Sequence, residues 1–300
     1  MLTSVSPRPA FLTDDSATIL RFAVDAIASG AVAALVTLVE IRGGSARRLG
    51  SQMAVREDGC YCGFVSGGCT EAAVATEALE AIAAGEDRRV SFGQGSTYFD
   101  IVLPCGGGIT LDIHVLRSPQ PLLAVLAALD ARTPAGLRYA PGPNTLEYVP
   151  RELVNGWNGP CFDIGYRPRT RLLLYGRSIE VEATAKLAQA ACYEVHVSDG
   201  SNARSTSTLI DADSAVALLF HDLDRELPAL RAALAASPFY IGALGSTRTH
   251  QRRIKALAEL GYSERDIARI KAPIGIFSKA RDAHALALSV LADLAAARTE

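Results

Sequence analysis

The chain has 300 residues, of which 49% are hydrophobic and 21% are charged. This length suggests two domains, and the composition is that of a globular protein. The net charge of −2 argues against a general nucleic-acid binder, which carries a basic excess, and against a polybasic membrane anchor. The longest apolar run, residues 31–39, is much shorter than the roughly 18 residues that cross a bilayer.

The first residues, MLTSVSPRPAF, contain no apolar segment of the kind found in a signal peptide. Export is therefore not expected, and the six cysteines are expected to be free thiols in a reducing compartment. We expect a cytoplasmic protein that neither crosses a membrane nor binds nucleic acid.

The first third of the chain is predicted to be an α/β unit. Helices are predicted over residues 14–29 and 70–84, where apolar residues recur at helical spacing before a glycine. Strands are predicted where apolar residues run together or alternate, at 32–41, 52–55, 60–64, 99–103 and 109–116.

Residues 118–170 are rich in proline and glycine. Only a short helix over 122–130 is predicted there, and the rest is expected to be an irregular connection. The predicted domains are therefore residues 1–118 and 169–300, joined by a linker over 119–168.

Strands and helices alternate from residue 171 onward, which predicts a Rossmann-like parallel sheet with crossover helices. The predicted strands are 172–175, 194–197, 215–220 and 239–243, and the predicted helices are 181–191, 225–235, 248–260 and 283–297. Ligands of such sheets bind at the carboxyl ends of the strands.

A glycine-cysteine loop follows one strand of the first domain. Ser66, Gly67, Gly68 and Cys69 stand between a predicted strand and a predicted helix. Glycines let the backbone approach a ligand closely, and amides at a helix start can bind an anion. Ser66 could cap the helix or donate to the ligand. A tight turn with an inert cysteine would give the same pattern. The loop alone is therefore compatible with a ligand site and with a purely structural turn.

A second loop between predicted strands also joins a cysteine to glycines. Cys105 is followed by Gly106 and Gly107, and three consecutive glycines are costly to order. Two such loops in one domain are typical of two walls of a single site. Two tight turns with inert thiols are the alternative.

The cysteines allow two metal sites. Cys69 and Cys105 could hold a soft metal, because thiolates suit such a centre. With Cys60 and Cys62 they could instead form a four-thiolate zinc site that stabilises a binding module.

Two basic loops are candidates for phosphate binding. Arg47 and Arg48 lie in the flexible loop over residues 43–50, and either could pair with a phosphate. Gly245, Ser246 and Arg248 follow a predicted strand and begin a helix, where amides, a hydroxyl and an arginine suit a phosphate. Solvated arginines would explain both loops without a ligand.

A predicted strand ending at Gly176, with Asp199 about twenty residues later, favours a dinucleotide site. The later glycines of the G-x-G-x-x-G motif are absent, and Arg177 follows Gly176 directly. An NAD(P)-dependent oxidoreductase with a degenerate Rossmann site is therefore disfavoured, but it remains an alternative.

Together these motifs resemble the XdhC/CoxI family of maturation factors for molybdenum hydroxylases. Residues 64–71, FVSGGCTE, are similar to the family's Ser-Gly-Gly-Cys-Val-Glu signature, and 103–107 to its Cys-Gly-Gly loop. Residues 240–246, YIGALGS, match its Tyr-Ile-Gly-x-Leu-Gly-Ser run. The loop over 43–53 is similar to a family run in which prolines stand where this chain has Ala46 and Arg48.

The resemblance implies a protein that binds and transfers a cofactor rather than one that turns over a substrate. Such factors bind molybdenum cofactor, protect it, support its sulfuration and insert it into an apo molybdoenzyme of the xanthine dehydrogenase or aldehyde oxidoreductase type. The cofactor is molybdopterin or its cytosine dinucleotide form. A cysteine desulfurase, a cofactor cytidylyltransferase and a second copy of the chain are further expected partners.

The residues expected to contact the cofactor come from both domains. They are Arg47, Ser66, Gly67, Gly68, Cys69, Cys105, Gly106, Gly107, Gly245, Ser246 and Arg248. Cys69 and Cys105 are the expected ligands of the metal.

Overall fold

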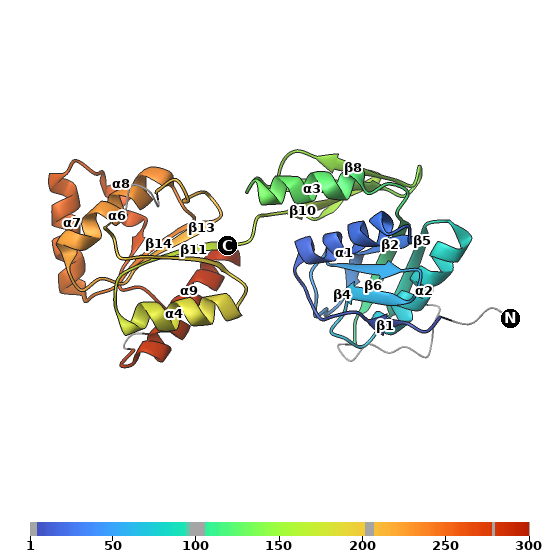
Figure 1. The fold of residues 1–300 in the computed structure, drawn as a ribbon, viewed down its shortest axis with the longest axis horizontal. Coiled ribbons are helices and arrows are strands. Elements are labelled where there is room, and N and C mark those ends of the chain that lie inside the picture. The colour runs from blue at the N-terminus through green and yellow to red at the C-terminus, as the bar shows by residue number, and fades with distance from the viewer. Residues whose placement is uncertain (1–4, 95, 97–105, 202–206, 278–279, 300) are drawn as a thin grey trace. The chain divides into compact units, whose positions relative to one another are not determined.

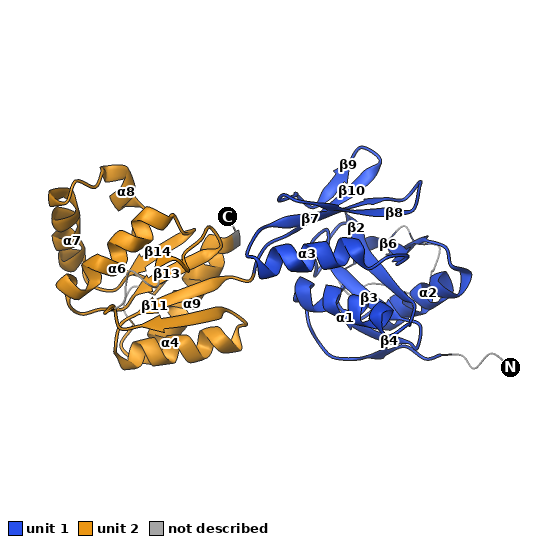
Figure 2. Ribbon diagram, turned by 45° about the horizontal axis from the view of Figure 1, so that its top comes forward, with its two compact units in different colours: residues 1–168 blue, residues 169–300 orange. Residues whose placement is uncertain are grey.

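The computed structural model describes residues 5–94, 96, 106–201, 207–277 and 280–299 (Figure 1). The chain forms two compact units, residues 1–168 and 169–300, which are shown in different colours in Figure 2. Each unit has its own sheet and its own buried core.

The first unit is built on a six-stranded sheet with the order β1-β4-β3-β2-β6-β5. Its strands are β1 (Arg8–Pro9), β2 (Ala33–Arg42), β3 (Gln52–Arg56), β4 (Cys60–Gly63), β5 (Arg88–Gly93) and β6 (Gly108–Val115). β1 runs parallel to β4, and the other neighbours are antiparallel. The long strand β2 is buried over most of its length because it is largely aliphatic. The predicted strand at 99–103 lies outside the described residues.

Two helices cover opposite faces of this sheet (Figure 1). Successive residues of a strand point to opposite faces, so Leu35 packs on the side of α1 (Ser16–Ala28) and Val36 on the side of α2 (Glu71–Ala84). Helix α1 begins after Asp15, whose carboxylate accepts a hydrogen bond from the Thr18 amide at 2.9 Å.

The segment over 119–168, expected to be a linker, is folded and belongs to the first unit. It forms α3 (Gln120–Asp130) and an antiparallel four-stranded sheet with the order β8-β7-β10-β9. These strands are β7 (Ala135–Ala140), β8 (Thr145–Val149), β9 (Gly156–Asn158) and β10 (Cys161–Tyr166). Alternate residues such as Leu137 and Ile164 join the core beneath α1, whereas the prolines fall in turns and in the first turn of α3. The expectation of an irregular linker was wrong because these turn residues obscured short strands.

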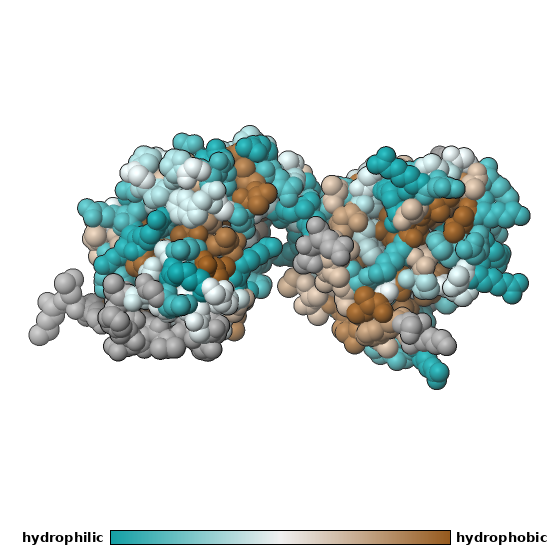
Figure 3. Space-filling model, turned by 180° about the vertical axis from the view of Figure 1, so that it is seen from behind, coloured by the Kyte–Doolittle hydropathy of each residue, from teal (hydrophilic) through white to brown (hydrophobic). Residues whose placement is uncertain are grey.

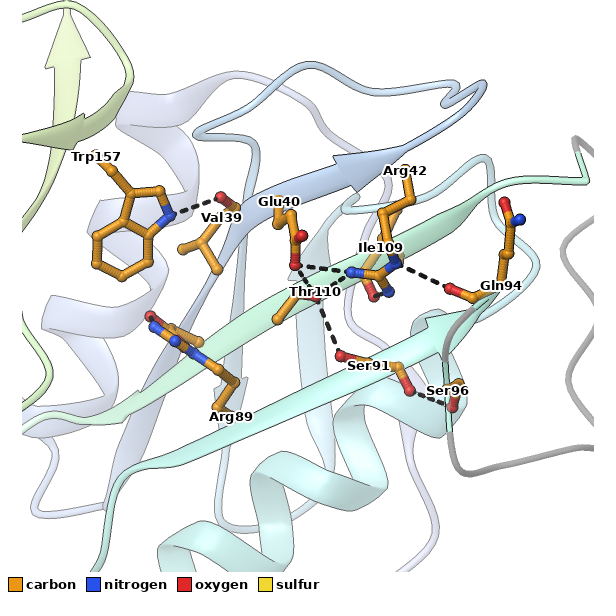
Figure 4. Close-up of polar contacts among 11 residues, drawn as sticks. Val39, Glu40, Arg42, Arg89, Ser91, Gln94, Ser96, Ile109, Thr110 and Trp157 are labelled. Carbon is orange, nitrogen blue, oxygen red and sulfur yellow. Dashed lines mark hydrogen bonds and ion pairs between the residues drawn. The ribbon is translucent and has the colours of Figure 1, made fainter.

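A β-bulge links the second sheet to the first. The pairing of β2 with β6 shifts register between Leu38 and Glu40, and the carbonyl of Val39 accepts a hydrogen bond from the Trp157 indole at 3.1 Å (Figure 4). The Arg89 guanidinium lies over the indole ring at 5.0 Å. The carbonyl that the bulge removes from the ladder is thereby satisfied.

The second unit is built on a parallel sheet, as the sequence predicts, and its five strands have the order β12-β11-β13-β14-β15. The short strand β15 was not predicted. Its strands are β11 (Arg171–Tyr175), β12 (Glu194–Ser198), β13 (Ser214–Leu218), β14 (Tyr240–Ala243) and β15 (Ile270–Lys271). Helices α4 (Ile179–Ala190) and α9 (Ala283–Thr299) cover one face. Helices α6 (Leu223–Ala236), α7 (Thr247–Glu259) and α8 (Glu264–Ala268) lie on the other face.

The surface is mixed in character. On the face shown in Figure 3, hydrophobic side chains lie in small groups among hydrophilic ones, as on most folded domains. Among the described residues, no helix is both long enough and apolar enough to span a bilayer.

Candidate functional site

Three loops of the first unit meet at the same end of its sheet. The loop after β2 lies between the loop after β4 and the loop before β6. A Cβ atom at Gly67 would lie 3.4 Å from the Cβ of Ala46, and one at Gly107 would lie 2.3 Å from the carbonyl oxygen of Gly44. Only glycine permits the second approach. The structure therefore brings Arg47, Gly67 and Gly107 into one group of loops.

The start of the central loop is fixed by Arg42, the last residue of β2. Its guanidinium donates to the Glu40 carboxylate at 2.7 Å, to the Thr110 hydroxyl at 2.7 Å and to the carbonyl of Gln94 at 2.9 Å (Figure 4). These bonds hold the end of β2 against β6 and against the residue that follows β5. The loop over 43–51 thus begins from a rigid position.

A buried carboxylate organises the glycine-cysteine loop. Glu71, 2% exposed, accepts hydrogen bonds from the amides of Val65, Ser66 and Thr70 at 3.2, 2.8 and 3.2 Å. The Ser66 hydroxyl also donates to it, at 2.8 Å. Ser66 is 5% exposed, so its hydroxyl supports the loop rather than facing solvent. The amides expected to bind an external anion are in part used by Glu71.

The tip of this loop remains open. Gly67, Gly68 and Cys69 are exposed, and their amides donate no hydrogen bond to any described residue. The Cys69 sulfur lies 3.6 Å from the Ser66 hydroxyl oxygen. Cys69 therefore presents its thiol on a loop whose base is fixed and whose tip has spare donors.

The second predicted cysteine, Cys105, lies outside the described residues. Its neighbour Gly106 is exposed, and Gly107 packs against the backbone of the loop over 43–51. The structure thus describes the glycines of the second loop but leaves its thiol as a prediction.

Arg47 bridges the loops. Its Nε donates to the carbonyl of Ser66 at 3.3 Å, and its guanidinium lies over the Phe64 ring at 5.3 Å. It also pairs with the largely exposed carboxylate of Asp14 at 3.2 Å. Arg47 is therefore held beside the glycine-cysteine loop while its charge stays partly accessible.

Cys60 and Cys62, the other two cysteines of the predicted zinc site, are poor zinc ligands. Cys62 packs in the core beneath α1, and burial raises the pKa of its thiol to about 12. Cys60 is also buried and accepts a hydrogen bond from Nε of Arg8 at 3.2 Å. No three His, Cys, Asp or Glu side chains within the described ranges are arranged to hold a metal ion. The geometry offers the zinc alternative no support there.

The other predicted phosphate-binding residues lie in the second unit, at the carboxyl end of β14. Ser246 is the N-cap of α7, and its hydroxyl accepts a hydrogen bond from the Thr249 amide at 3.3 Å. Gly245 has a φ of +128°, and Arg248 is exposed. Arg253, on the same helix, is fully buried in an ion pair with Glu226, so its guanidinium is not accessible to an external anion.

The turn after β11 keeps a single glycine for a steric reason. A Cβ at Gly176 would lie 2.8 Å from the carbonyl oxygen of Leu219. Arg177 pairs with Asp199, at the position expected to contact the ribose of a dinucleotide. Hydrogen bonds from Ser201, together with Arg177, hold the pKa of Asp199 well below its usual range. The acidic residue of the NAD(P) alternative is therefore already paired.

Sequence reasoning overlooked Glu71 as a functional residue. The signal was present, because an acidic residue follows the cysteine by two positions and opens an apolar helix. An acid at a helix start is ordinarily explained by the helix dipole, and only the structure shows this one turned inward.

Comparisons with known proteins agree with these features. A model described as the XdhC Rossmann domain matches residues 172–294, and one described as the XdhC and CoxI family matches residues 26–93. A curated Escherichia coli protein, the molybdenum cofactor insertion chaperone PaoD, is 61% identical over 97% of this chain and 92% of its own length. The chain belongs to the XdhC and CoxI family. The family prediction is thereby confirmed.

Two further comparisons are more distant. The uncharacterised E. coli protein YqeB is 27% identical over 87% of this chain and 42% of its own length. A crystal structure described as a xanthine dehydrogenase from Bacillus halodurans is 19% identical and superposes with a TM-score of 0.72, covering 93% of this chain and 95% of that one. The second comparison supports the fold alone.

Proposed function

We propose that this protein is a molybdenum cofactor carrier that inserts its cargo into an apo molybdoenzyme of the aldehyde oxidoreductase or xanthine dehydrogenase type. Its 61% identity to a molybdenum cofactor insertion chaperone over nearly the whole chain supports this role. The carrier works in the cytoplasm and binds and transfers the cofactor rather than consuming it.

One structural observation carries the proposal. Cys69 is exposed at the tip of a loop whose base is fixed by the buried carboxylate of Glu71. A thiolate is a suitable ligand for a soft metal centre. The amides at Gly67, Gly68 and Cys69 have no acceptor among the described residues, so they can donate to oxygen or sulfur atoms of the cargo.

The proposal also covers two modifications of the cofactor, its sulfuration and its conversion to the cytosine dinucleotide form. Support of sulfuration requires a sulfur donor such as a cysteine desulfurase. Use of the cytosine dinucleotide form requires a cytidylyltransferase upstream. Both proteins, and a second copy of this chain, are proposed partners. In the second unit, Gly245, Ser246 and Arg248 are proposed to bind the nucleotide part of the cytosine dinucleotide form.

The test measures the cofactor content of protein purified from a host that makes molybdenum cofactor. Molybdenum is measured by mass spectrometry and the oxidised pterin by fluorescence. The wild type should carry both in matched amounts, and Cys69→Ala should lose both. Cys192→Ala is the matched control, because Cys192 is an exposed cysteine in the second unit.

Cys105→Ala tests the ligand that the sequence alone implicates, and it should also lower the molybdenum content. Absence of both molybdenum and pterin from the wild type, even after incubation with free cofactor, would refute the carrier function. Equal content in the wild type and Cys69→Ala would refute the thiolate role.

A further inference from the structure

A polar cavity opens beside the glycine-cysteine loop, within the first unit. It has a volume of about 420 Å³, which is in the range of small-molecule sites. Its walls come from the start of α1, the loop over 43–51, the first residue of β3, the residue that follows β4, the residue that precedes β9, and strand β10. Phe64 lines it and begins the loop that carries Cys69. The cavity and the glycine-cysteine loop therefore share a wall.

Two amide side chains line the cavity with donors to spare. Gln52, 4% exposed, donates to the Thr37 hydroxyl at 3.3 Å and accepts from the Tyr166 hydroxyl at 2.6 Å. Asn155 donates to the carbonyl of Leu49 at 2.8 Å and accepts from the amide of Gly165. Each side-chain amide has two N–H groups, so each keeps one that no described residue accepts. The spare donor of the buried Gln52, with that of the half-buried Asn155 beside it, favours a ligand with hydrogen-bond acceptors.

The charge at the cavity is positive in balance. Two arginines, Arg47 and Arg48, line the cavity, and Asp14 contributes the one carboxylate among its lining residues. Arg48 makes no ion pair with any described residue, whereas Arg47 is held by Asp14 and Phe64. Arg48 is thus a guanidinium available for a phosphate. Phe64, together with Ile19 and Ile164, gives the cavity an apolar wall for a flat ring.

A ligand that satisfies all of these groups is a flat heterocycle with acceptor nitrogens and a phosphate. We propose that the cavity holds the phosphate-bearing pterin of the molybdenum cofactor, an inference that rests on the proposed function. Arg48 binds the phosphate, while Gln52 and Asn155 donate to the pterin ring. The metal end of the cofactor is left for the loop of Cys69.

The test uses a stable probe, the fluorescent oxidation product of molybdopterin that keeps the pterin ring and phosphate but lacks the metal and the dithiolene. The same probe after phosphatase treatment serves as the second ligand. Arg48→Ala should weaken binding of the phosphorylated probe about tenfold, as expected for loss of a charge-assisted hydrogen bond. It should change binding of the dephosphorylated probe by less than about twofold, within the small effects of a lost surface charge.

Arg151→Ala is the matched control, because Arg151 is an exposed arginine of the same unit that does not line the cavity. It should bind both probes as the wild type does. Equal affinity of Arg48→Ala and wild type for the phosphorylated probe would overturn the inference, as would a wild type that does not bind it.

The two proposals can fail separately. A wild type that carries molybdenum cofactor but does not bind the probe would remove the cavity and keep the carrier function. A wild type that binds the probe through Arg48 but never carries molybdenum would remove the carrier function and keep a pterin phosphate site.

Discussion

The hydroxyl of Ser66 donates to the carboxylate of Glu71 at 2.8 Å, and both side chains are almost fully buried. In many anion-binding loops the backbone amides are left for the ligand. Here the chain supplies its own anion at the base of the loop. The free donors are thereby confined to the exposed tip at Gly67, Gly68 and Cys69.

Replacement of this carboxylate should destabilise the first unit. Glu71→Ala leaves three amides and one hydroxyl without their acceptor. Each buried unsatisfied group costs roughly 1–3 kcal/mol, so we expect a loss of at least about 4 kcal/mol. Trp157 is the single tryptophan and lies in the first unit, so its fluorescence during guanidinium unfolding measures this loss.

Glu71→Gln should fall between Glu71→Ala and the wild type, because it keeps one acceptor oxygen. Glu86→Ala is the control, since Glu86 is exposed in the same unit. Unfolding midpoints that coincide for Glu71→Ala and Glu86→Ala would contradict the role assigned to Glu71.

The thiols should differ in reactivity. Cys69 and Cys192 are exposed, whereas Cys62 is buried and the pKa of its thiol is raised to about 12. Because the thiolate is the reacting species, iodoacetamide at pH 8 should modify Cys69 and Cys192 in the native protein and spare Cys62. Mass spectrometry of the digested protein locates the label. Native labelling of Cys62 at the rate of Cys69 would show that the core beneath α1 is open.

A buried carboxylate should make the first unit sensitive to acid. Burial alone would raise the pKa of Asp87, but hydrogen bonds from His114, Arg117 and Tyr139 outweigh it and lower the pKa. A lowered pKa in the folded state contributes stability that is present above the usual aspartate pKa of about 3.9. This stability is lost as the pH falls below that value, through the folded pKa.

Asp87→Asn should therefore lower the stability of the first unit at pH 7 by about 3 kcal/mol, as for other broken buried ion pairs. The difference between wild type and variant should shrink as the pH falls from 5 toward 3. Guanidinium unfolding at a series of pH values, followed at Trp157, measures both effects. A difference that stays constant down to pH 3 would show that Asp87 is not the titrating group.

The buried pair of Arg253 and Glu226 gives a test in the second unit. Arg253→Met leaves the Glu226 carboxylate buried without its partner, and we expect a loss of about 3–5 kcal/mol. The double variant with Glu226→Leu should recover most of it, because two apolar side chains can replace a buried pair. Thermal unfolding followed by circular dichroism compares the three proteins. A double variant no more stable than Arg253→Met would contradict this account.

The second unit could be predicted from the sequence because its strands are apolar runs separated by helices of regular spacing. The predicted strand over 239–243 corresponds to β14 (Tyr240–Ala243), for example. The second sheet of the first unit could not, because its strands are short and its turns are rich in proline. Its burial depends on contacts such as that of Trp157 with Val39, which lie 118 residues apart in the chain.

The candidate site was also predicted from the sequence only in part. The motifs placed Gly67, Gly107 and Arg47 in loops, and the structure brings these loops together. The inward turn of Glu71 and the buried pairing of Arg253 were not predictable. Both depend on which face of a helix the rest of the fold covers, and a charged residue in a sequence is ordinarily taken to face water.

The cavity beside the glycine-cysteine loop is lined by residues near the beginning and near the end of the first unit's sequence. Asp14 and Tyr166 line the same space. During synthesis the chain emerges from its N-terminus, so a nascent chain that already displays Cys69 has no finished cavity next to it. The cavity is completed only when β10 has left the ribosome and docked beneath α1. An unfinished chain can therefore expose the thiol but cannot enclose a ligand beside it.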